Sequence, residues 1–147
     1  MMAVSRSMTT QTSDEEGSAK IYIEPVPASR PRVPRFGRPF YVGRYKEFRQ
    51  ELELAVADVP PWLPDGPVHV QVMFICKKPK KPTNPYPKGD IDNYIKAIWD
   101  GLNGKWGFKD DRQIVSVEAE KRYAKIEEEP HILILVWRKH DHKEGSG

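Results

Sequence analysis

Apolar and polar side chains recur along the chain with two different periods, and each period is typical of one kind of element. Alternating positions or a short apolar run indicate a strand, whereas apolar positions three and four residues apart indicate a helix with one apolar stripe. These patterns predict strands at residues 20–26, 68–76, 114–124 and 131–139. Helical spacing predicts helices at residues 44–58 and 91–102.

The elements follow one another in the order β-α-β-α-β-β, which predicts a single α+β domain. The last strand is apolar on both faces and is therefore expected at the centre of the sheet. The two helices each carry one apolar stripe, so both are expected to pack on one mixed β-sheet. The domain is expected to span residues 20–140. The polar residues 1–19 and 141–147 are predicted to be a disordered N-terminal tail and a flexible C-terminal tail.

The composition of the chain excludes several classes of protein. Its 147 residues suit one domain, since domains commonly contain about 100–150 residues. The longest apolar run spans residues 132–137 and is far shorter than the roughly 20 residues that a membrane-spanning helix needs. The N-terminal segment has an acidic run and no apolar stretch, so we expect no secretory signal or transit peptide. A single cysteine, Cys76, excludes an internal disulfide framework and favours a cytoplasmic protein.

The basic charge is concentrated in two proline-rich segments. The formal net charge is +3 at pH 7, but residues 28–49 contain seven basic side chains and one acid, and residues 77–88 contain five lysines and no acid. Such concentration is typical of proteins that bind a polyanion, because each Lys or Arg that meets a phosphate releases condensed counterions. Phe36, Phe40 and Tyr41 lie among the arginines, where aromatic rings can stack on bases. The alternative is a solubilising surface.

Four carboxylates flank the second predicted helix. Asp90 and Asp92 lie at its start, and Asp110 and Asp111 come after it, directly before a predicted strand. A helix followed by a returning turn is expected to bring the two pairs together. Carboxylates held close together repel one another unless a cation lies between them. Oxygen ligands select hard cations, which near a phosphate indicates Mg²⁺ or, as a substitute, Mn²⁺.

The same residues also fit ordinary structural roles. Asp90 and Asp92 are typical of a helix N-terminus, where they cap the helix or interact favourably with its dipole. Lys96 stands one helical turn after Asp92 and can form an ion pair with it. Asp110 and Asp111 are common turn residues. On this interpretation the chain is a non-catalytic nucleic-acid-binding module.

Other candidate functional residues fit the core better. Cys76 ends an apolar strand and is expected to be packed rather than reactive. Tyr45 and Phe48 belong to the apolar stripe of the first predicted helix, so they are expected in the core rather than on a base-stacking surface.

The ordered combination of acidic and basic residues resembles the RusA family of Holliday junction resolvases, which are found in bacteria and their prophages. The resemblance covers roughly residues 20–138, including a basic, proline-rich loop after the first strand. It is most specific over residues 89–115. That stretch contains, in order, Asp90-x-Asp92-Asn93, Lys96, Asp100 and Asp110-Asp111-x-Gln113-Ile114.

The resemblance implies an Mg²⁺-dependent, structure-selective endodeoxyribonuclease that acts in DNA recombination and repair. It implies a homodimer that cuts branched DNA, above all the four-way junction, by paired symmetric nicks. By matching positions, it implies that the catalytic metal ligands are Asp90, Asp92 and Asp111, and that the family's essential lysine is Lys96. The roles of the two remaining acids of the motif stay open.

The expected reaction is hydrolysis of a phosphodiester bond. A water activated by the metal is expected to attack the scissile phosphate in line and, as the resemblance implies, to leave a 5′-phosphate and a 3′-hydroxyl. Lys96 is expected to contact the phosphate or to stabilise developing charge. Contacts with the DNA backbone are expected from Arg30, Arg32, Arg35, Arg38, Lys77, Lys78, Lys80 and Lys81. A metal-dependent nuclease acting on other branched DNA, such as flaps, is the alternative.

Overall fold

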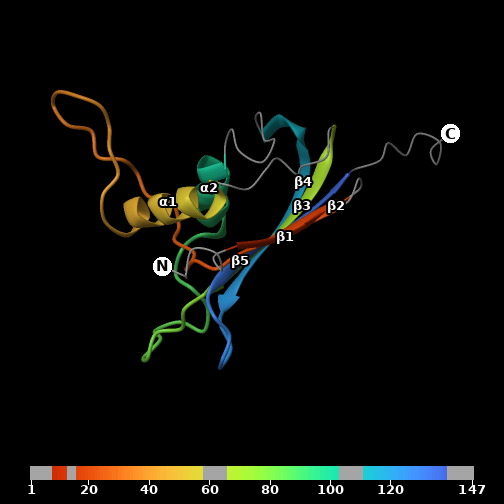
Figure 1. Ribbon diagram of the computed structural model, residues 1–147. Helices are drawn as coiled ribbons and strands as arrows, with labels where there is room; N and C mark the ends of the chain where they lie inside the picture. Colours follow the sequence, from red (N-terminus) through yellow and green to blue (C-terminus); the bar gives the residue numbers. More distant parts are fainter. Residues whose placement is uncertain (1–7, 13–15, 58–65, 103–110, 139–147) are drawn as a thin grey trace.

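The computed structural model describes residues 8–12, 16–57, 66–102 and 111–138 of the chain (Figure 1). Its elements are β1 (Met8–Thr12), β2 (Glu16–Ile21), α1 (Gly43–Val56), β3 (Val68–Cys76), α2 (Ile91–Leu102), the single 3₁₀ turn η2 (Asp111–Gln113), β4 (Ile114–Tyr123) and β5 (His131–Arg138). From β2 onward the order is β-α-β-α-β-β, which confirms the predicted α+β domain with a mixed sheet and two helices. The bounds of β3 and α2 are those predicted from the sequence.

Within the described residues, the sheet has five strands in the order β1-β2-β5-β3-β4. β3 and β4 are parallel, whereas all other neighbours are antiparallel. β5 is the central strand, as its apolar sequence predicts, and Ile132, Ile134 and Val136 are fully buried. Because β3 and β4 are parallel, the chain between them must return from one end of the sheet to the other, and α2 lies in this crossover.

Both helices cover the same face of the sheet (Figure 1). Phe48 and Leu52 of α1 and Ile98 and Leu102 of α2 belong to one buried cluster with the inner residues of β2, β3 and β5. The burial of Phe48 and of Tyr45 confirms the core positions predicted from the first helical stripe. Within the described ranges, no helix combines the length and the apolarity that a membrane span requires.

The structure corrects the prediction for the N-terminal part of the chain. Residues 1–19 are not one disordered tail, because they contain β1 and the first part of β2. β2 also begins and ends earlier than the strand predicted at residues 20–26. Its inner face begins with Gly17 and Ala19, and such small residues do not produce the apolar alternation that indicates a strand. The tail predicted at residues 141–147 lies outside the described residues.

The close contact between Gly101 of α2 and Leu52 of α1 can be tested by substitution. A Cβ atom added to Gly101 of α2 would overlap the side chain of Leu52 on α1, which is completely buried. Alanine gains about 1 kcal/mol over glycine in a helix, whereas overpacking a core costs about 1–3 kcal/mol. We expect Gly101→Ala to lower the free energy of unfolding, measured with urea. In a Leu52→Ala background the same change should be neutral or stabilising, and a loss of equal size there would contradict the proposed overlap.

Candidate active site

The first turn of α2 lies where the parallel strands end. Residues 77–90 lead from the end of β3 into α2, and the carboxyl ends of parallel strands are where open sheets of this kind commonly bind ligands. The carbonyl oxygen of Asp90 accepts hydrogen bonds from the N–H groups of Asn93 at 3.0 Å and Tyr94 at 3.2 Å. Asp90 is therefore the N-cap residue, directly before the first residue of α2. The unpaired N–H groups of a first helical turn create a positive potential there.

Three charged side chains of the predicted site stand exposed on and before this turn. They are the carboxylates of Asp90 and Asp92 and the ammonium group of Lys96. Among the described residues, none of the three has a hydrogen-bond or ion-pair partner. The ion pair between Asp92 and Lys96, which is one part of the structural alternative, is therefore not formed. All three charges stay available to a ligand.

The residue before Asp90 is closely packed. A Cβ atom at Gly89 would lie 2.7 Å from Cε2 of Tyr94 and 2.8 Å from Cγ of Pro27. Ala28, which follows Pro27 in the chain, donates its N–H to the carbonyl oxygen of Asn93 at 2.9 Å. Only a glycine fits at this point, and the packing fixes the backbone from which Asp90 projects.

Two basic segments meet at the first turn of α2. One is the arginine arm (residues 28–42), which starts at the hydrogen bond to Asn93, and the other is the lysine loop (residues 77–88), which runs directly into Gly89. From this common root they extend away from the sheet in different directions (Figure 1). The eight basic residues predicted to contact DNA are all exposed on them: Arg30, Arg32, Arg35, Arg38, Lys77, Lys78, Lys80 and Lys81. The acidic residues therefore lie between two cationic surfaces.

The arginine arm doubles back on itself. Arg32 and Phe40 exchange two backbone hydrogen bonds, of 2.7 and 2.9 Å, and the chain reverses near Gly37, whose φ of 102° is in the region that favours glycine. Phe36 lies beside this reversal and is 85% exposed. An exposed aromatic ring among guanidinium groups is suited to stacking on an unpaired base.

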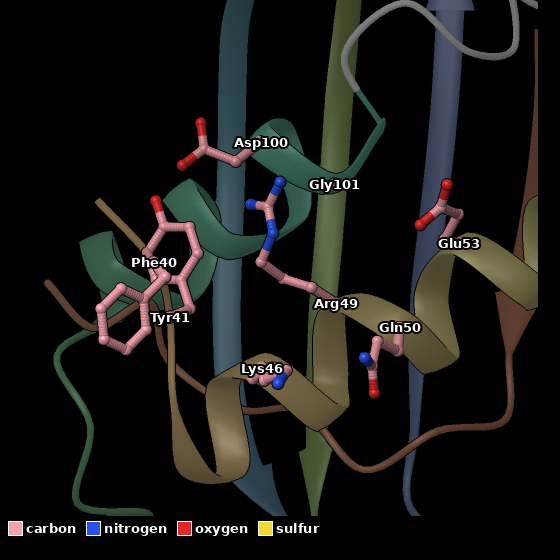
Figure 2. Close-up of a pocket in the computed structure, with 8 residues that line it drawn as sticks. All are labelled: Phe40, Tyr41, Lys46, Arg49, Gln50, Glu53, Asp100 and Gly101. Carbon is pink, nitrogen blue, oxygen red and sulfur yellow. The ribbon is translucent and has the colours of Figure 1, made fainter. Parts of the chain in front are cut away.

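A pocket of about 420 Å³ opens between α1, α2 and the end of the arginine arm (Figure 2). Arg49 extends from α1 toward Asp100 of α2, and its guanidinium carbon lies 5.1 Å from the centre of the Tyr41 ring. Asp100 is exposed two turns after Asp92 on α2. The pocket contains two acidic and two basic side chains, so its charge alone does not favour an anion.

The only cysteine lies behind this site in the core. Burial raises the pKa of the Cys76 thiol, and its Sγ atom lies 3.8 Å from the hydroxyl of Tyr94. Burial also raises the pKa of Tyr94. Cys76 is buried, which confirms that it is packed, and the raised pKa disfavours the thiolate that a nucleophile requires.

The backbone of Asp111 lies apart from Asp90 within one chain. The backbone of Asp111 begins η2, which leads into β4 beside the start of β3. Gly89, in contrast, contacts Lys121, which lies near the other end of β4. At about 3.3 Å per strand residue, the length of β4 therefore places the backbone of Asp111 roughly 20 Å from that of Gly89, the residue before Asp90.

The expectation that the turn after α2 brings the two acidic pairs together stays a prediction, because that turn lies outside the described residues. The described backbone places Asp111 at the opposite end of the β3–β4 pair from Asp90. The physical reason is the parallel crossover, which delivers the chain to the opposite end of the sheet from the start of α2 (Figure 1). Asp110 lies outside the described residues, and only the backbone of Asp111 is described. Among the side chains that the structure describes, no three acids, histidines or cysteines converge to hold a metal ion.

Comparisons with known proteins identify relatives over most of the chain. The profile of a family described as "Endodeoxyribonuclease RusA" matches residues 22–136. A protein of Bacillus subtilis (strain 168), "Uncharacterized protein YqaN", is 29% identical over 134 residues, which cover 79% of this chain and 92% of that protein. The family match includes the arginine arm, the lysine loop, α2 and β4, and hence every residue of the predicted site.

The close packing at Gly89 predicts a local effect of substitution. We expect Gly89→Ala to displace the backbone at Asp90, because Cβ contacts below 3 Å cannot persist against the rigid ring of Pro27. The free energy of unfolding should fall by about 1–3 kcal/mol, and hydrogen exchange at the amides of Asn93 and Tyr94 should accelerate. Thr83→Ala, at an exposed position of the lysine loop, should change neither quantity. Unchanged exchange in Gly89→Ala would disprove the constraint.

Proposed function

The chain belongs to the RusA family of endodeoxyribonucleases, and from that membership we propose that it resolves four-way DNA junctions by paired, symmetric nicks. As a member of this family the protein is an enzyme that hydrolyses DNA. The observation that carries the finer proposal is a set of acidic and basic side chains at the start of α2, between two exposed cationic segments, that have no partner among the described residues. We infer that it acts in the cytoplasm of a bacterium, in recombination and repair of chromosomal or prophage DNA.

The donors at the start of α2 fit a hard divalent cation. Asp90 and Asp92 offer carboxylate oxygens that are exposed and unpartnered among the described residues, and Mg²⁺ prefers such oxygens together with those of a substrate phosphate. A bound Mg²⁺ or Mn²⁺ would lower the pKa of water and stabilise charge on the phosphate. Two protein carboxylates leave room for the DNA, and the third predicted ligand is Asp111.

The basic residues around these carboxylates have two proposed roles, which are contact with the scissile phosphate and binding of the DNA backbone. Lys96 lies one turn from Asp92 and carries no ion pair within the described ranges, so we assign it to the scissile phosphate and its developing charge. The arginine arm and the lysine loop bind the backbone of the DNA on either side. Contacts of this kind set affinity and position rather than sequence preference.

The distance between Asp111 and Asp90 supports a site completed by a second copy of the chain. One chain offers Asp90 and Asp92 at one end of the β3–β4 pair and Asp111 at the other. In a two-fold homodimer the same patches of both copies face each other, so Asp111 of each copy can complete the site of the other. Two such sites related by a two-fold axis match the approximate two-fold symmetry of a four-way junction.

The acidic residues generate the first test of this function. We expect Asp92→Asn to reduce nicking of a mobile four-way junction by about 10³-fold, since a metal supplies several kcal/mol and each 1.4 kcal/mol is one decade. Junction affinity should be unchanged or higher, because a charge that repels phosphate is removed. Glu120→Gln, an exposed acid on β4, is the control and should cut normally.

The same assay separates the alternatives. Wild-type protein should nick opposing strands of the junction in Mg²⁺ and not in EDTA, with slower cutting of linear and flap substrates. A nucleic-acid-binding module would bind without nicking in any metal, and a flap nuclease would prefer flaps. Wild-type activity in Asp92→Asn would refute the assigned site.

Mixing two inactive variants tests whether the site is shared between copies. Asp92→Asn and Asp111→Asn should each be inactive alone. In a mixed dimer with shared sites, one site carries both substitutions and the other carries none, so nicking of one strand should reappear on mixing and refolding. If all three acids of a site came from one chain, both sites of the mixed dimer would be defective and no activity would return.

The basic segments generate a test based on salt. Each phosphate contact contributes about 0.9 to the slope of log affinity against log salt concentration. We expect the double variant Lys77→Ala, Lys80→Ala to bind junctions more weakly and to lower this slope by about 2, measured by fluorescence anisotropy. Lys20→Ala with Lys125→Ala removes the same charge from other surfaces and should leave the slope unchanged. An equal change in both variants would show that net charge, not the lysine loop, governs binding.

A further inference from the structure

Lys121 occupies an unusual position for a charged residue. It lies on the inner face of β4, between Ala119 and Tyr123, and its register partner on β3 is the buried Phe74. Lysine on the inner face of a strand normally requires a carboxylate partner, because burying an unpaired charge is costly. Among the described residues, no carboxylate pairs with Lys121.

The partners of Lys121 are backbone carbonyl groups at the end of the lysine loop. Its Nζ atom donates to the carbonyl oxygen of Pro87 at 2.8 Å and to that of Gly89. The same ammonium lies 5.6 Å from the centre of the Tyr86 ring, within the range of a cation–π interaction. Two of its three N–H donors are therefore directed at backbone carbonyl groups of the protein.

A second residue of β4 holds the same loop further from the site. The hydroxyl of Tyr123 lies 3.1 Å from the carbonyl oxygen of Asn84 and 2.9 Å from that of Tyr86. The loop needs such partners because prolines supply no N–H and prevent a regular ladder. Tyr123 thus fixes the middle of the loop, whereas Lys121 fixes the residues that directly precede Asp90.

We propose that Lys121 is a positioning residue that fixes the peptide before Asp90 and thereby sets the direction of the Asp90 carboxylate. The idea rests on the proposed function, in which that carboxylate binds a divalent ion. Gly89 is held on one side by the Lys121 ammonium and on the other by Tyr94 and Pro27. Without the ammonium the peptide can rotate and the Asp90 carboxylate samples more directions. Asp92 lies within α2 and keeps its place.

The test compares three variants of the full-length protein. Lys121→Met keeps the side chain up to the position of Cε and removes its charged end, and Lys121→Arg keeps donors for the two carbonyls. Lys125→Met removes an exposed lysine from the nearby turn as a control for charge. Each is measured for Mn²⁺ affinity by electron paramagnetic resonance, for nicking at saturating metal, and for junction affinity in EDTA.

We expect Lys121→Met to weaken Mn²⁺ binding at least tenfold and to slow nicking at saturating metal. Its junction affinity should stay within about twofold of wild type, since a positioning residue does not touch DNA. Lys121→Arg should recover part of the Mn²⁺ affinity, and Lys125→Met should match wild type. Weaker junction binding with a salt slope reduced by about 1 and unchanged Mn²⁺ affinity would make Lys121 a phosphate contact and overturn the proposal.

Tyr123→Phe separates positioning from general loss of stability. It loosens the same loop, but away from Asp90, so it should lower the free energy of unfolding without changing Mn²⁺ affinity. If Lys121→Met does not fold, Lys121→Arg and Tyr123→Phe carry the comparison. Equal loss of Mn²⁺ affinity in Tyr123→Phe and in the Lys121 variant would reduce Lys121 to a structural residue.

Hydrogen exchange distinguishes failure of this proposal from failure of the proposed function. The amides of Asn93 and Tyr94 donate to the Asp90 carbonyl, so their exchange reports the position of Asp90 without metal or DNA. Faster exchange in Lys121→Met and normal exchange in Lys125→Met support positioning even if the wild-type protein cuts no junction. A wild-type protein that cuts junctions, combined with unchanged exchange and Mn²⁺ affinity in Lys121→Met, refutes positioning alone.

Discussion

The parallel pairing of β3 and β4 is the constraint on which the site depends. A connection between parallel neighbours must return the chain to the end of the sheet where the first strand began. The first turn of α2 is consequently fixed at one end of the pair, and β4 begins at the other. The lysine loop, the root of the arginine arm and Lys121 all meet at that first turn, so the sheet determines which charges surround Asp90 and Asp92.

The two basic segments keep their charges exposed because their backbones cannot collapse onto the sheet. Prolines fix φ and remove N–H donors, so such segments stay extended and form few regular hydrogen bonds. Carbonyl groups that are left over then need donors from elsewhere. In the lysine loop these donors are the Lys121 ammonium and the Tyr123 hydroxyl. Rigidity of the loop and the direction of Asp90 are thus two results of the same contacts.

Sequence patterns predicted the elements of this fold better than their arrangement. The bounds of β3 and α2 follow from strong alternation and a single apolar stripe, whereas β1 and the start of β2 were missed because threonine, glycine and alanine carry no apolar signal. Asp90, Asp92 and Lys96 are exposed, and the ligand site that the sequence pattern places there stays a prediction. The separation of Asp111 does not follow from any local pattern, since periodicity does not reveal whether two strands are parallel. The sequence offers one indication of the role of Lys121, which is a charged residue at an inward-facing position of a strand.

If the site is divided between two copies, as proposed, cutting depends on formation of the dimer. A single chain presents Asp90, Asp92 and Lys96 without the third carboxylate, so on this arrangement it binds a divalent ion weakly and cuts little. In the proposed homodimer, Asp111 of the second copy would complete the site and create two equal sites related by a two-fold axis, like the two strands to be cut in the junction. Cutting would then be restricted to the assembly that can make matched nicks in opposing strands. The basic side chains of the arginine arm and the lysine loop are exposed in each chain, so on the proposed mechanism DNA binding would not require the dimer. Binding and cutting would then be separable steps, because the crossover places the backbone of Asp111 away from Asp90 in one chain.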